Sequence, residues 1–133
     1  MNSPPPLRPS CPPGTCTCRR DELLETPGAD VRILLLTRHE ERRLLERLES
    51  MQSLDDLERV RQRMYDQLGI RMTVAPGLNE VRSMRGIAIE FAEQPGLCRK
   101  TRPAIAAAIR RGLETHPEVA WRLLDAHDLL GGL

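Results

Sequence analysis

Three short stretches of the chain alternate between apolar and polar positions, as β-strands do. They span residues 31–36, 70–74 and 87–91. In the first, successive leucines make both faces apolar, which is typical of a strand buried on both sides. Each of the other two is followed by a proline–glycine pair, at residues 76–77 and 95–96, that closes a strand and turns the chain. The pattern therefore predicts three strands.

A longer periodicity, with apolar side chains every three to four residues, predicts two helices within residues 37–68. Thr37 fits an N-cap, and Glu40 is placed to return the hydrogen bond in a capping box. Ser53 is a second N-cap, and Gly69 ends the second helix. We expect a helical hairpin with a short turn. Its apolar faces consist of Leu44, Leu45, Leu48 and Met51, and of Leu54, Leu57, Val60, Met64 and Leu68.

The same periodicity returns in the last third of the chain and predicts two more helices. Thr101 is the expected N-cap of the first, with Pro103 in its first turn, and the pair at residues 116–117 breaks it. The second spans residues 118–130, and a short additional helix is expected at residues 20–25. The apolar faces of the two long helices consist of Ile105, Ile109 and Leu113, and of Val119, Leu123, Leu124 and His127 or Leu130.

The element order is then β-α-α-β-β-α-α. We expect an α+β fold, with a small three-stranded sheet packed against two helical hairpins. Residues 1–20 form a Pro/Cys-rich arm that is expected to bind a metal, and residues 21–133 form a single domain. The expected core consists of Ile33, Leu35, Leu45, Leu48, Leu57, Val60, Met64, Val74, Ile87, Ile89, Ile105, Ile109 and Leu123.

Composition narrows the classes of function. The 133 residues are 40% hydrophobic and only 2% aromatic, and the net charge is +1. So few rings cannot form a stacking platform for single-stranded nucleic acid, and so little net charge gives no global field for DNA or a membrane. All 20 basic residues except Lys100 are arginine. This bias suggests a GC-rich, bacterial genome.

The expected location is the cytoplasm. Residues 1–9 contain no apolar segment of the kind found in signal peptides, and no apolar run is long enough to cross a membrane. Thiols remain reduced in the cytoplasm, where clustered cysteines favour metal binding or catalysis over disulfides.

Three of the four cysteines lie within eight positions of the arm. Cys11, Cys16 and Cys18 have the spacing C-x4-C-x-C, and Cys98 follows eighty residues after Cys18. Residues 12–14 supply a tight turn that can direct the three arm sulfurs toward one centre. We therefore predict that all four cysteines bind one metal centre, and that Cys98 closes the site.

The spacing leaves the kind of centre open. Four thiolates suit Zn²⁺, the preferred prediction, and they also suit an iron–sulfur cluster. The C-x-C step occurs in Cu(I) sites as well. Without a metal, the arm would carry reduced thiols or a redox disulfide. We expect the surroundings of Cys98 to favour a thiolate, because Arg99, Lys100 and the start of a helix follow it.

Nothing in the chain indicates catalysis: the sequence contains no nucleotide-binding loop, nucleophile elbow or HExxH motif. The preferred function is an accessory or regulatory metal protein that acts through a protein partner. An iron–sulfur electron-transfer or redox-sensing protein is the first alternative. A nucleic-acid-binding regulator is the second. It would use the basic cluster, which we define as Arg99, Lys100, Arg102, Arg110 and Arg111.

Overall fold

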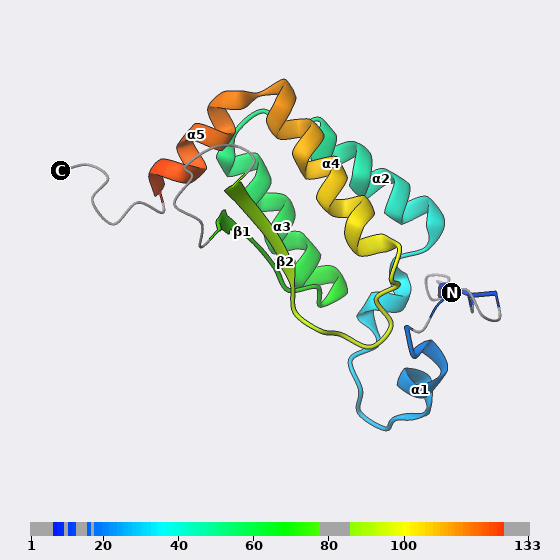
Figure 1. The fold of residues 1–133 in the computed structure, drawn as a ribbon. Helices are drawn as coiled ribbons and strands as arrows, with labels where there is room; N and C mark the ends of the chain where they lie inside the picture. Colours follow the sequence, from blue (N-terminus) through cyan, green and yellow to red (C-terminus); the bar gives the residue numbers. More distant parts are fainter. Residues whose placement is uncertain (1–6, 10, 13–15, 17, 78–85, 127–133) are drawn as a thin grey trace.

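The computed structural model describes residues 7–9, 11, 12, 16, 18–77 and 86–126. Within these residues the chain is mixed α+β (Figure 1). The elements are α1 (Arg20–Glu25), the 3₁₀ helix η1 (Arg32–Leu35), α2 (Arg38–Glu49), α3 (Leu54–Leu68), β1 (Met72–Pro76), β2 (Ile87–Phe91), α4 (Thr101–Thr115) and α5 (Pro117–Ala126). The predicted α+β class is confirmed.

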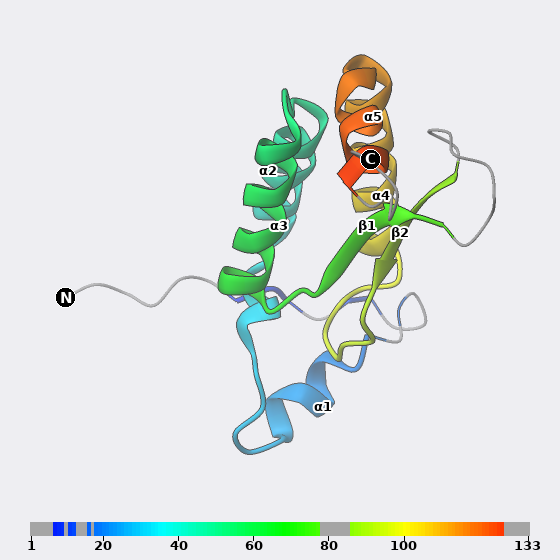
Figure 2. The same ribbon diagram turned by 90° about the vertical axis from the view of Figure 1, so that its left-hand side faces the viewer.

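The helices form two groups around a common core. Figure 2 shows α2 and α3 side by side, opposite α4, α5 and the β1–β2 hairpin, with α1 at one end of the molecule. Helix α4 crosses α2 closely at Gly112, where a Cβ would lie 2.7 Å from the Leu48 carbonyl oxygen. A glycine there brings the two helices together, as ridges-into-grooves packing requires.

The predicted caps of the first helical hairpin are largely confirmed. The Thr37 hydroxyl accepts a hydrogen bond from the Glu40 amide at 3.3 Å, and Ser53 accepts one from the Asp56 amide at 3.1 Å. Gly69 ends α3 in the left-handed conformation, with φ 72°. The reciprocal half of the capping box is absent among the described contacts, since the Thr37 amide donates to the Leu35 carbonyl at 2.9 Å.

The strand predicted at residues 31–36 is wrong, because this segment contains η1. Ile33, Leu34 and Leu36 are buried as expected, whereas Leu35 is half-buried and Val31 is exposed. Three residues per turn place Ile33 and Leu36 on the same face of the turn, so a 3₁₀ helix also buries an apolar run. The apolar side chains of this segment pack into the core, and a short 3₁₀ helix can bury them without pairing to a neighbouring strand.

The sheet of the described residues therefore has two strands rather than three. β1 and β2 pair antiparallel, with Met72 opposite Phe91 and Val74 opposite Ile89. These four side chains share one face, which is the buried face, as the alternating pattern predicts.

Two boundaries of the C-terminal helices differ from prediction. Thr101 is the first residue of α4 and is buried, and Lys100 occupies the N-cap without a side-chain hydrogen bond. Helix α5 begins at Pro117, because proline is tolerated in a first helical turn. The predicted end of this helix, with His127 and Leu130, lies outside the described residues.

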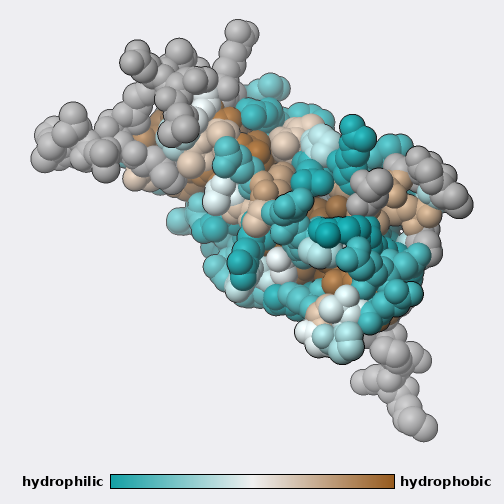
Figure 3. Space-filling view, turned by 60° about the horizontal axis from the view of Figure 1, so that its bottom comes forward, coloured by the Kyte–Doolittle hydropathy of each residue, from teal (hydrophilic) through white to brown (hydrophobic). Residues whose placement is uncertain are grey.

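The core agrees with the predicted apolar faces at most positions. Ten of the thirteen predicted core residues are buried, and Leu35, Leu45 and Ile89 are partly buried. Hydrophilic residues cover much of the described surface in Figure 3, with smaller hydrophobic areas between them. No helix in the described part of the chain is long and apolar enough to span a membrane.

Candidate metal centre

The structure brings all four cysteines together at the end of the molecule that carries α1. Their sulfur atoms lie within 4.8 Å of one another. The Cys11 Sγ is 3.5 Å from that of Cys98 and 3.9 Å from that of Cys18. All four are free thiols, so this arrangement does not depend on a disulfide.

Hydrogen bonds that involve backbone groups attach the arm to the rest of the chain beside these sulfurs. The Arg8 amide donates to the Leu34 carbonyl at 2.7 Å, and the Gly96 amide donates to the Cys18 carbonyl at 2.5 Å. The Arg20 Nε donates to the Arg8 carbonyl at 2.8 Å. The arm is thereby attached both to η1 and to the turn that leads to Cys98.

Gly96 allows that turn to approach the core. Its φ is +89°, a conformation that favours glycine. A Cβ at this position would lie 2.6 Å from Cγ2 of Ile33 and 2.9 Å from Cδ2 of Leu23. A larger residue would therefore push away the segment that delivers Cys98.

A second unusual backbone conformation follows Cys18, on the arm side of the centre. Arg19 is left-handed, with φ 60°, and its carbonyl accepts the Leu23 amide at 3.0 Å. This turn starts α1 immediately after Cys18. Leu23 then inserts into the core and holds the short helix in place.

The environment distinguishes the four thiols. Burial, the strongest influence on Cys16, favours the neutral thiol, but hydrogen bonds from the Arg99 backbone and from neighbouring cysteines lower its pKa to about 7. Burial raises the pKa of Cys98, and a hydrogen bond with Cys11 raises it further. Burial also raises the pKa of Cys11. At Cys98 burial therefore outweighs the cationic neighbours that were expected to favour a thiolate, and the Arg99 amide lowers the pKa of Cys16 instead.

The donor set is chemically suited to one soft metal ion. Tetrahedral zinc with Zn–S bonds of about 2.3 Å requires sulfur atoms about 3.8 Å apart. The two S–S distances at Cys11, 3.5 and 3.9 Å, lie on either side of this value. All four cysteines could therefore bind a single ion with small adjustments of their side chains.

Arg8 is the residue near the centre that sequence reasoning missed. Its side chain is buried, its Nη2 donates to the Gly96 carbonyl at 2.5 Å, and the same nitrogen lies 3.7 Å from Cys18 Sγ. Its position three residues before Cys11 was the only available signal, and arginine in a polar segment is ordinarily solvated.

The predicted basic cluster begins beside the centre. Arg99 and Lys100 are exposed next to Cys98, and Arg102 is half-buried. Arg110 and Arg111 lie two helical turns further along α4. The first donates to the Ile87 carbonyl at 3.1 Å, and the second forms an ion pair with Glu49. Two of the five basic side chains therefore already have partners on the same molecule.

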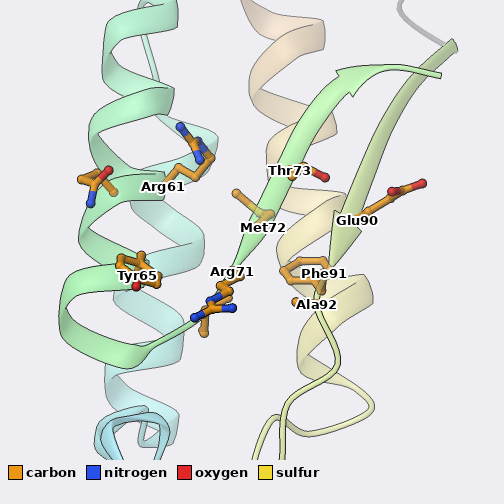
Figure 4. A pocket seen from close by; sticks show the side chains of 10 residues that line it. Arg61, Tyr65, Arg71, Met72, Thr73, Glu90, Phe91 and Ala92 are labelled. Carbon is orange, nitrogen blue, oxygen red and sulfur yellow. The ribbon is translucent and has the colours of Figure 1, made fainter. Parts of the chain in front are cut away.

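A separate cleft of about 510 Å³ lies between α3 and the sheet (Figure 4). Tyr65 lines it, and the guanidinium groups of Arg32 and Arg71 each lie 5.8 Å from the centre of its ring. Among the described residues that line this cleft there is no cysteine or histidine. The four cysteines lie together at the candidate centre, and none of them lines this cleft.

The chain matches no protein-family model, and no curated protein or solved structure shows significant similarity to it. The function must therefore be inferred from the geometry and chemistry of the cysteine centre.

Proposed function

We propose that the protein binds one Zn²⁺ ion through Cys11, Cys16, Cys18 and Cys98. The observation that carries this proposal is the mutual separation of the four sulfurs, none of which exceeds 4.8 Å. A four-iron cluster inserts irons and sulfides between its cysteine ligands, which must then lie farther apart than the ligands of one ion. The compact donor set therefore favours a single tetrahedral ion over the iron–sulfur alternative.

The proposed role of the ion is to fix the arm against the turn that precedes α4. Such a centre, closed by four protein ligands, has no open position for substrate and is typical of structural rather than catalytic zinc. We therefore propose an accessory or regulatory protein rather than an enzyme. The reducing cytoplasm of a bacterial cell is the proposed setting, since the thiols must remain reduced to bind the ion.

A groove between α2 and α3 is the surface proposed for the protein partner. It has a volume of about 940 Å³, and the half-buried Leu35, Leu44 and Leu68 contribute to its lining. Three arginines and two glutamates also line it, including the exposed Arg63. An amphipathic helix with an apolar face and acidic flanks has the matching chemistry. We propose that the partner contributes such a helix.

Elemental analysis of anaerobically purified protein tests the metal proposal. We expect about one zinc per chain and no visible colour. Cys16→Ser should lose the zinc, whereas His116→Ala, which removes a potential ligand outside the centre, should retain it. A brown protein that contains iron and sulfide would instead establish the iron–sulfur alternative. Protein free of metal after growth with zinc would overturn the proposal.

The partner proposal needs a separate experiment. The immobilised wild type should retain a partner protein, and the His116→Ala variant should retain it as well. The Leu44→Glu variant should not retain it, because the substitution introduces a charge into the groove. Arg63→Glu should weaken the retention of the partner protein and make that retention less sensitive to salt. Equal retention by Leu44→Glu and the wild type would reject the groove as the binding surface, whatever the metal content.

A further inference from the structure

Arg8 is a buried cation whose charge no described carboxylate balances. Arg8 is buried, with only 8% of its surface exposed, and its Nε has no hydrogen-bond partner among the described residues. None of the ion pairs among the described residues involves Arg8. A buried charge is costly unless an opposite charge or hydrogen bonds compensate it. Because the hydrogen bond to the Gly96 carbonyl is to a neutral acceptor, the position favours a negative partner.

The cysteine centre is the group that can supply this negative charge. Nη2 of Arg8 lies 3.7 Å from Cys18 Sγ, within the range of a hydrogen bond to sulfur. Cys18 is itself buried, so solvent screens the pair only weakly. Four thiolates around a divalent ion carry two net negative charges, which are likewise costly to bury.

The location of Arg8 is fixed independently of this charge. The backbone of Arg8 is held on one side by the Leu34 carbonyl and on the other by Arg20 Nε. The guanidinium also donates to the Gly96 carbonyl, two residues before Cys98. The side chain thus lies between the arm and the turn that together supply the ligands.

We propose that Arg8 is the positioning residue and counter-cation of the metal centre. Its guanidinium offsets part of the charge of the metal-bound thiolates and donates a hydrogen bond to the Cys18 sulfur. This inference rests on the proposed function, because it requires the four cysteines to bind a divalent ion. Residues that contact the ligands of a metal, but not the metal itself, tune the metal affinity by orienting those ligands and stabilising their charge.

Zinc competition against a chromophoric chelator tests the role of Arg8 in the full chain. Arg8→Met should weaken zinc binding by about 10–100-fold. Arg8→Lys should recover most of the affinity, because it restores the charge and a donor. Arg61→Met is the matched control: it removes an arginine that pairs with Glu58 on α3 and leaves the guanidinium of Arg8 beside Cys18. It should change the affinity less than Arg8→Met.

The outcomes separate this inference from the proposed function. Wild-type protein that binds no zinc would refute the proposed function itself. Wild-type binding with an unchanged affinity in Arg8→Met would overturn only the role of Arg8. Equal weakening in Arg8→Met and Arg8→Lys would also overturn it, because packing rather than charge would then explain the loss. If Arg8→Met does not fold by circular dichroism, near-wild-type affinity in Arg8→Lys together with a loss in Arg8→Gln is the expected result, and equal affinities would reject the inference.

Discussion

The two ends of this molecule are stabilised by different means. The helical body, which we define as residues 37–77, 86–91 and 101–126, has side-chain caps on α2 and α3 and most of the apolar core. The site end, which comprises the described residues from 7 to 36 together with residues 92–100, has one short helix, one 3₁₀ turn and a few hydrogen bonds around the cysteines. It contributes fewer side chains to the same core, namely Leu23, Ile33, Leu34, Leu36 and Leu97. Burial of apolar area dominates folding energetics, so the body is expected to fold without the metal and the site end to depend on it.

The largest effect is expected from damage to the body. Ile109 is fully buried in α4, whereas Ile89 in β2 is only partly buried. Ile109→Ala should lower the free energy of unfolding by about 2–5 kcal/mol, and Ile89→Ala should lower it by less. Urea denaturation measures both values. A loss below about 0.5 kcal/mol for Ile109→Ala would contradict the placement of the core.

A smaller effect is expected from Gly96→Ala at the junction of the two ends. Both Gly96 and Gly28 have positive φ values, but an added Cβ meets Ile33 and Leu23 only at Gly96. Gly28→Ala should therefore lower the free energy of unfolding by about 1 kcal/mol, because only the backbone conformation is unfavourable there. Gly96→Ala should cost a further 1–3 kcal/mol or so through overpacking, and should also weaken zinc binding. Similar losses in the two variants, measured by thermal unfolding, would show that the contact at Gly96 is unimportant.

The smallest effect on the body is expected from removal of the metal. A strong chelator should leave most of the helical circular dichroism signal and the main melting transition, because α2 to α5 carry their own core contacts. Deletion of residues 1–20 should give the same result. Loss of most helical signal in either experiment would show instead that the ion holds the whole fold together, as in a zinc finger.

The difference between the two ends also explains which elements of the fold could be predicted from the sequence. Helices α2 and α3 carry local signals and begin where the caps Thr37 and Ser53 predict, whereas Met51, expected on the first helix, lies beyond its end at Glu49. The apolar run at residues 31–36 has no such signal, since a buried strand and a buried 3₁₀ turn can share one composition. Its tertiary surroundings decide between them.

The clustering of the four cysteines was predictable from the sequence, but the electrostatics around them were not. Three cysteines close together in an arm, and a fourth in a turn, indicated convergence on one centre, and the structure places their sulfurs together. The sequence neighbours of Cys98 predict a lowered pKa there, yet burial raises the pKa of Cys98 and the Arg99 amide lowers that of Cys16. Likewise, Arg8 becomes recognisable only when the arm is seen against Gly96. These contacts join segments that are distant in the chain.

The separation of the ligands along the chain sets an order of events during synthesis. Cys11 and Cys98 lie 87 positions apart, and the arm cysteines leave the ribosome first. At about 5–20 residues per second, translation needs roughly 4–17 seconds to reach the fourth ligand. During that interval the nascent chain presents three thiols that no protein ligand can yet complete. The proposed site can therefore be completed only after Cys98 has been synthesised, and until then the exposed thiols of the arm are open to oxidation or to binding of a wrong ion.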